Sequence, residues 1–332
     1  MRRTFPVLAV TATVAALVLS GCGSGDAAPA GNANNNGAAG GKITLGFAQV
    51  GAESGWRTAN TKNIQESAAA AGIELKFSDG QQKQENQIKA IRSYIAQKVD
   101  VIAFSPVVES GWGTVLREAK DAHIPVILTD RAVDDPDTSL YRSFIGSDFV
   151  AEGKKAGDWL VQQYQGKSDP VNIAELQGTT GSAPANDRKQ GFGEVISADS
   201  KFKIIASQSG DFTRAGGKSV MEAFLKAHKD IDVLYAHNDD MGLGAIEAIE
   251  AAGLTPGKDI KIITVDAVHD GMQALADGKI NFIVECSPLL GPQLMELVKK
   301  VAAGQDVPQR VLTKETTFTQ EQAKVALPDR KY

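Results

Sequence analysis

The sequence predicts an α/β protein with two doubly wound parallel-sheet lobes and a ligand cleft between them. From residue 42 onward, short apolar runs alternate with helix-like amphipathic runs, which is the pattern of βαβ units and a parallel sheet. The apolar runs are nearly continuous in Val, Ile and Leu, as in strands covered on both faces. Four such units fill residues 43–142 and five fill 148–280, which favours two sheets over one.

The expected strands follow one another at regular intervals. In the first half they cover residues 43–49, 73–78, 99–106, 125–130 and 143–148; in the second half they cover 171–178, 202–209, 233–239, 260–266 and 281–287. Helices are expected between most of them, for example at 83–97, 151–163, 218–228 and 289–303. Open α/β sheets bind ligands at the carboxyl ends of their strands, and pockets favour domain interfaces.

The N-terminus is expected to be an export signal rather than part of the fold. Arg2 and Arg3 precede the apolar run 7–19, which is too short to span a membrane and ends in Leu-Ser-Gly-Cys. This resembles the lipobox of bacterial lipoproteins, so residues 1–22 are predicted to be a signal peptide with Cys22 as the lipidation site. An ordinary secretory signal is the alternative. Residues 23–41, rich in Gly, Ala and Asn, are predicted to be a disordered tether.

Charge and cysteine content narrow the function classes. The 332-residue chain has a formal charge of −5, with no strongly basic segment, so nucleic acid is a poor partner. Beyond Cys22 the only cysteine is Cys286, so no internal disulfide stabilises the exported domain. Cys286 lies in an apolar run and is expected to be a small buried hydrophobe.

Charged, amide and aromatic side chains follow the predicted strands. A sugar hydroxyl both donates and accepts hydrogen bonds, so carboxylates paired with Arg or Asn suit it, and aromatic rings suit the C–H faces of the sugar ring. Trp56 as plain core, and each Asp-Arg pair as a surface ion pair, are the alternatives. The residues concerned are Glu53, Trp56, Arg57, Asp130, Arg131, Arg188, Phe212, Asn238, Asp266 and Glu285.

The charges in this set are roughly balanced. A net buried charge is costly, so a balanced set favours a neutral ligand, whereas an anionic ligand needs surplus arginine or bare helix N-termini. The arginines are 57, 131 and 188, and the acids are 53, 130, 266 and 285.

From Lys42 to Tyr332 the chain resembles the periplasmic sugar-binding proteins of ABC transporters, in the ribose/galactose class, and most of all their galactofuranose-binding members. Segments that carry the resemblance include VGAESGWRTA, LTDRAVD, ELQGTTGS, DRKQGF, SQSGDFTR and YAHNDDMGLGAIEAI. The resemblance implies the periplasmic binding protein type I fold, with crossings near Gly146, Cys286 and Leu312. The expected lobes are 42–146 with 287–312, and 147–286 with 313–332.

The resemblance also implies the function and the site. It implies a receptor that closes around a monosaccharide and delivers it to ABC permease subunits. The family usually lacks an anchor, so the lipobox and tether are a departure from it, and they indicate an exported receptor that is lipid-anchored on the outer side of the cytoplasmic membrane or in the periplasm. We expect the receptor to be monomeric and to need no cofactor or metal. Phe212 matches the position of a second stacking aromatic and Glu285 that of a hinge residue contacting the sugar. The other expected contacts are Glu53, Ser54, Gly55, Trp56, Arg57, Asp130, Arg131, Arg188, Asn238 and Asp266.

The sequence was also compared with three other functions, those of an enzyme, a transcriptional repressor and a sugar sensor. The sequence has no G-x-S-x-G, H-E-x-x-H or C-x-x-C motif, and its four histidines are scattered, so neither an enzyme nor a metal site is expected. A transcriptional repressor with this core would need a helix-turn-helix before it, where the signal and tether stand. A sugar sensor for a chemoreceptor or a histidine kinase shares the fold, and the sequence does not separate it from a transport receptor.

Overall fold

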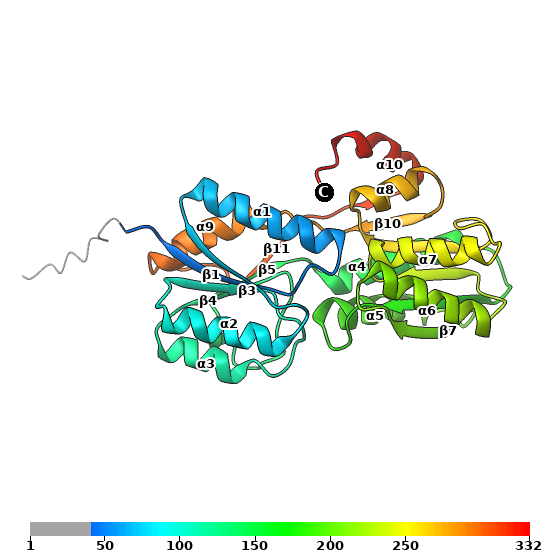
Figure 1. The fold of residues 1–332 in the computed structure, drawn as a ribbon. Coiled ribbons are helices and arrows are strands. Elements are labelled where there is room, and N and C mark those ends of the chain that lie inside the picture. The colour runs from blue at the N-terminus through cyan, green and yellow to red at the C-terminus, as the bar shows by residue number, and fades with distance from the viewer. Residues whose placement is uncertain (1–40) are drawn as a thin grey trace, which may run out of the picture. The chain divides into compact units, whose positions relative to one another are not determined.

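The computed structural model describes residues 41–332, in which residues 42–332 form one compact unit of two α/β lobes (Figure 1). Each lobe is built on a six-stranded sheet. The expected fold class is therefore confirmed. Within the described residues no helix is long and apolar enough to cross a membrane.

The first lobe contains a fully parallel sheet in the order β11-β5-β4-β3-β1-β2. Apart from the edge strand β11, this is the 2-1-3-4-5 order of a doubly wound sheet. Its strands are β1 (Thr44–Gln49), β2 (Glu74–Asp79), β3 (Val101–Phe104), β4 (Val126–Thr129), β5 (Ser143–Gly146) and β11 (Arg310–Leu312). Its helices are α1 (Gly55–Ala71), α2 (Gln84–Ala96), α3 (Gly113–Asp121), η1 (Thr138–Leu140) and α9 (Gly291–Ala302).

The second lobe repeats this order as β12-β10-β9-β8-β6-β7, with β12 antiparallel at the edge. Its strands are β6 (Val171–Gln177), β7 (Phe202–Ser209), β8 (Val233–Ala236), β9 (Lys261–Asp266), β10 (Phe282–Glu285) and β12 (Thr317–Phe318). Its helices are α4 (Phe149–Gln163), α5 (Ala183–Ile196), α6 (Arg214–Ala227), α7 (Asp239–Ala251), α8 (His269–Ala276), α10 (Gln320–Ala326) and η2 (Leu327–Asp329).

All ten strands expected from the apolar runs are present, and the two additional strands lie at sheet edges. β11 and β12 contain three and two residues, and β11 is largely exposed. A short edge strand needs no continuous apolar run, so hydrophobicity alone does not indicate it. Both faces of each sheet carry a separate apolar core, which explains why the central strands are apolar throughout.

The chain passes between the two sheets three times. It leaves the first sheet after β5, returns after β10, and crosses again between β11 and β12. The crossing segments are residues 147–148, 286–290 and 313–316. The two lobes are thus connected by three short backbone segments. This arrangement permits rotation of one lobe against the other.

Candidate ligand-binding site

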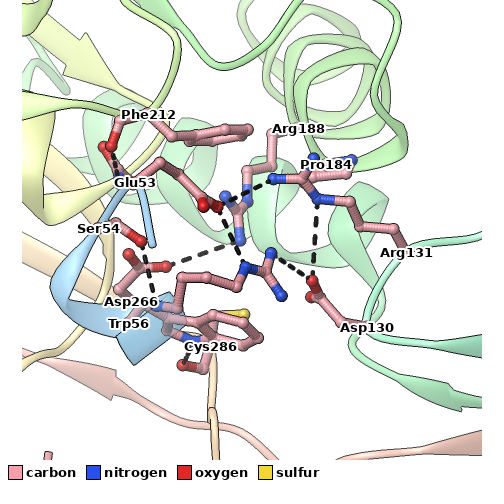
Figure 2. Close-up of a pocket in the computed structure, with 12 residues that line it drawn as sticks. Glu53, Ser54, Trp56, Asp130, Arg131, Pro184, Arg188, Phe212, Asp266 and Cys286 are labelled. Carbon is pink, nitrogen blue, oxygen red and sulfur yellow. Dashed lines mark hydrogen bonds and ion pairs between the residues drawn. The ribbon is translucent and has the colours of Figure 1, made fainter. Parts of the chain in front are cut away.

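One pocket is lined by side chains from both lobes (Figure 2). The side chains converge so closely that the remaining cavity is about 20 Å³, room for roughly one water molecule. Its lining consists of Glu53, Ser54, Trp56, Arg57, Asp130, Arg131, Pro184, Arg188, Phe212, Asn238, Asp266 and Cys286. Ten of the twelve residues expected from the sequence are therefore brought together.

In the first lobe, Arg57 is the centre of a buried ion-pair network. Its Nη2 donates to Oδ2 of Asp130 at 2.7 Å and its Nε to Oε1 of Glu53 at 3.1 Å. The arginine reaches both because Ser54 caps α1 by accepting from the Arg57 amide, which sets the first helical turn beside the end of β4. Although burial raises the pKa of Glu53, Arg57 and Arg131 hold it below its ordinary value.

Arg131 lies beside this network and makes fewer contacts that offset the cost of burying its charge. Its Nη2 lies 3.6 Å from Oε1 of Glu53, and its Nη1 donates to the Val107 carbonyl at 3.0 Å. Burial, together with the positive charge of Arg57, lowers the pKa of Arg131 to about 10. The charged form of Arg131 is therefore less favourable in this site than in water, even with its acidic neighbours present.

In the second lobe, Arg188 extends from α5 towards the same cavity. Its Nε donates to Oε2 of Glu152 at 2.7 Å, its Nη1 donates to the His237 carbonyl at 2.7 Å, and its Nη2 lies 3.9 Å from Oδ1 of Asp266. Burial lowers the pKa of Arg188, but Glu152 and Asp266 more than offset it and raise the pKa above its ordinary value. Burial raises the pKa of Asp266 well above its ordinary range, against the effect of Arg188.

Two aromatic rings, Trp56 and Phe212, line the cavity from opposite lobes. The indole of Trp56 donates to the Cys286 carbonyl at 2.7 Å, which ties the ring to the crossing after β10. The guanidinium carbon of Arg131 lies 5.3 Å from the ring centroid of Phe212. Gly178 makes room for this ring, since a Cβ there would lie 1.9 Å from a Phe212 ring carbon.

Three lining residues have unusual backbone conformations. Asp130, Phe212 and Asp266 have φ angles of 60°, 60° and 122°, a region that non-glycine residues seldom adopt. For a bulky ring such as Phe212 this conformation costs free energy that the surrounding structure must offset. Strain of this kind clusters at binding sites, where it aims a side chain at a ligand.

The lobes also contact each other at the rim of the pocket. The amide of Gly55, at the start of α1, donates to Oδ2 of Asp240 in the other lobe at 2.7 Å. Across a second contact, the Glu109 amide donates to the Gly181 carbonyl at 2.9 Å, and Asn186 donates to the Glu109 carboxylate at 2.5 Å. The cleft is therefore in a closed arrangement.

The structure places two of the expected contacts elsewhere. Gly55 does not line the pocket; its amide makes the contact between the lobes instead. Glu285 is turned away from the cavity, where it pairs with Arg330 at 2.8 Å and accepts from the Tyr332 hydroxyl at 3.2 Å. The C-terminal segment supplies this partner, so Glu285 satisfies its charge outside the pocket.

Two lining residues were not expected from the sequence. Pro184 follows no strand directly, and the sequence indicates only a small buried hydrophobe at Cys286. Cys286 is indeed buried, with 1% of its surface exposed, but it also borders the cavity. The proximity of Pro184 and Cys286 to the cavity depends on how the lobes meet, for which the sequence holds no local signal.

The lining contains guanidinium and carboxyl groups in equal number. With Glu285 outside, three guanidinium groups face three carboxyl groups, those of Glu53, Asp130 and Asp266. Two buried atoms of the lining, Oε2 of Glu53 and Nε of Arg131, have no hydrogen-bond partner among residues 41–332. One accepts and the other donates, which is the pairing that a neutral hydroxyl group satisfies.

Comparison with known proteins agrees with this geometry. Residues 45–306 match the model of the periplasmic binding protein domain family. The chain is 50% identical over 293 residues to the galactofuranose-binding protein YtfQ of Escherichia coli K12, covering 87% of this chain and 92% of that protein.

Two solved structures are also similar. A Mycobacterium smegmatis protein in complex with β-D-fucofuranose is 66% identical, with a TM-score of 0.86 and coverage of 87% of this chain and 95% of that one. The periplasmic binding protein component of the arabinose ABC transporter from Shewanella sp. ANA-3, bound to α- and β-L-arabinofuranose, is 49% identical, with a TM-score of 0.84 and coverage of 87% and 96%. The chain belongs to the periplasmic binding protein domain family.

Proposed function

We propose that this chain is a transport receptor that captures a neutral monosaccharide in its furanose ring form, galactofuranose-like, and delivers it to an ABC-type permease. The relatives named above bind galactofuranose, fucofuranose and arabinofuranose, and they do not favour the sensor alternative. The observation that carries the proposal is a pair of buried pocket atoms without a hydrogen-bond partner, Oε2 of Glu53 and Nε of Arg131, which a neutral hydroxyl group satisfies.

The proposed binding mechanism is exchange of internal contacts for sugar contacts. A cavity of about 20 Å³ does not admit a sugar, so the lobes open by rotation about the three crossings and close again around the ligand. Sugar hydroxyls then donate to Glu53 and Asp130 and accept from Arg131 and Arg188, replacing part of the ion-pair network. Asn238 lines the pocket, but its amide already donates to the Phe212 carbonyl and caps α7, so its proposed role is to hold Phe212 in place.

Ring form is the sharpest test of the proposal. D-Galactose, D-fucose and L-arabinose, each carbon-13 labelled at the anomeric carbon, are titrated against the protein by calorimetry, and the bound form is identified by its NMR chemical shift. We expect the furanose form to be enriched on the protein although it is the minor form in solution. Exclusive binding of the pyranose form, or tighter binding of a sugar phosphate or uronic acid, would overturn the proposal.

We further propose that the receptor is exported, monomeric and lipid-anchored through Cys22, a residue outside the described region. The closed lobes would present one surface from each lobe to the permease, so that an open, empty receptor is not recognised. The anchor is tested by detergent phase partition of the protein expressed in a bacterium with lipoprotein processing. We expect Cys22→Ser to move the protein from the detergent phase to the aqueous phase, and no difference would contradict the anchor.

A further inference from the structure

Behind the ligand pocket, the carboxyl groups of Glu152 and Glu315 meet at the point where the three crossings converge. Glu152 lies in the first turn of α4 and has 1% of its surface exposed. Glu315 lies in the crossing between β11 and β12 and is partly buried. Carboxyl oxygens of the two residues lie within 4.8 Å of each other and of the Cys286 sulfur.

Glu315 connects all three crossings. Its Oε1 accepts from the hydroxyl of Ser147 at 2.5 Å, from the hydroxyl of Thr313 at 2.8 Å and from the amide of Ser287 at 3.0 Å. Each donor comes from a different crossing segment. A single carboxylate oxygen therefore links the three crossing segments.

Glu152 connects this point to the ligand pocket. Its Oε2 accepts from Nε of Arg188 at 2.7 Å, whereas its Oε1 is buried and has no hydrogen-bond donor among the described residues. A proton on Oε1 would make this atom a hydrogen-bond donor, and a carboxyl oxygen of Glu315 lies within 4.8 Å of a carboxyl oxygen of Glu152.

We infer that Glu152 and Glu315 form an acid pair that shares one proton. The pair holds Arg188 in place beside the three crossing segments that connect the lobes. The importance of Arg188 for sugar binding rests on the proposed function, but the shared proton does not.

The charged groups around Glu152 and Glu315 favour a proton bound to the pair. Arg188 contacts two carboxyl groups, Glu152 at 2.7 Å and Asp266 at 3.9 Å, and Nζ of Lys155 donates to the backbone carbonyl of Glu315 at 3.3 Å. Burial, opposed by Arg188 and reinforced by Glu315, raises the pKa of Glu152 to about 8. The titratable and charged groups facing the pair are Arg188 from α5, Tyr235 from β8, Asp266 at the end of β9, Cys286 after β10 and Lys155 from α4.

A cation held by Glu152, Cys286 and Glu315 is the competing explanation for the cluster. It is disfavoured because Arg188 occupies one oxygen of Glu152 and three donors already point at Oε1 of Glu315. Burial also raises the pKa of the Cys286 thiol well above its ordinary range, which keeps the sulfur protonated and a poor ligand.

The test is the pH dependence of thermal stability without sugar, so it does not depend on the proposed function. Glu152 has an ordinary pKa of 4.5 and a folded pKa of about 8, so the folded state binds the extra proton and stability falls as pH rises towards 8. Between pH 6 and pH 9 we expect the wild-type melting temperature to fall by about 5 °C more than that of Glu152→Gln. The glutamine mimics the protonated acid, since it donates to Glu315 and accepts from Arg188.

The control is Glu194→Gln on α5, an exposed glutamate paired with Lys154, which should follow the wild-type curve. Glu315→Gln should flatten the curve less than Glu152→Gln does, because burial still raises the pKa of Glu152 after Glu315 has lost its carboxyl group. Parallel curves for wild type and both variants would overturn the inference, as would failure of Glu152→Gln to fold at pH 6. A chelator-dependent melting temperature would assign the cluster to a cation instead.

With sugar, the affinity of Glu152→Gln should stay within about threefold of wild type, whereas Glu152→Ala should weaken binding at least tenfold by releasing Arg188. Equal affinities of the alanine and glutamine variants would show that Glu152 does not position Arg188.

Discussion

Replacing Arg131 by methionine should separate sugar binding from stability. The Arg131 guanidinium is 2% exposed, lies 3.6 Å and 3.8 Å from the carboxylates of Glu53 and Asp130, and carries an unsatisfied Nε. Removing one member of a buried, hydrogen-bonded charge set costs about 2–5 kcal/mol, so the Kd for the sugar should rise by roughly 30-fold to several thousand-fold. Isothermal titration calorimetry measures this change directly.

The same substitution should not destabilise the free protein. The pKa of Arg131 falls from 12.5 to about 10 because the site is buried and Arg57 is nearby. At pH 7 the charged form is therefore disfavoured by roughly 3 kcal/mol relative to the unfolded chain, an upper bound on the gain from its removal. Loss of a partner for Glu53 offsets part of this gain, so we expect the melting temperature to stay constant or to rise by up to about 6 °C.

Arg92→Met is the matched control, because Arg92 is exposed and pairs with Glu118 at 2.8 Å on the surface of the same lobe. It should change the Kd less than twofold and the melting temperature by about 1 °C or less. An Arg131→Met protein that binds the sugar within threefold of wild type would refute the assignment of the pocket. A melting temperature lowered by more than 5 °C would refute the electrostatic reasoning.

Three further substitutions test individual features of the site. Gly178→Ala should weaken sugar binding at least tenfold, because the added Cβ would lie 1.9 Å from a ring carbon of Phe212 and displace the ring; an unchanged Kd would show that the ring does not contact the sugar. Trp56→Phe keeps an aromatic face but loses the hydrogen bond to the Cys286 carbonyl, so we expect a loss of about fivefold in affinity by calorimetry; a thousandfold loss would point to a direct indole–sugar contact. Glu285→Gln should leave the Kd within twofold and lower the melting temperature by about 2 °C in a thermal-shift assay, because its ion pair lies outside the pocket; a large rise in Kd would restore Glu285 to the site.

The sequence alone determined the fold class and the strand order along the chain. Central strands such as 101–104 and 126–129 are apolar throughout because both faces of each sheet are covered, and this pattern is visible without coordinates. The sequence also indicated that polar residues gather where the parallel strands end. Asp130 directly follows β4, Asp266 ends β9, and Glu53 lies in the loop between β1 and α1.

The tertiary structure decided which of those residues face the cavity and which partner satisfies each charge. Glu285 ends a strand as Asp266 does, yet the C-terminal Arg330 draws it out of the pocket through a contact 45 residues away in sequence. Glu152 was not singled out in the sequence because nothing local distinguishes a glutamate in the first turn of a helix from a surface acid. Only the packing of α4 against the three crossings buries it between Arg188 and Glu315, and burial, which depends on segments distant in the chain, decides whether a carboxyl group holds its proton.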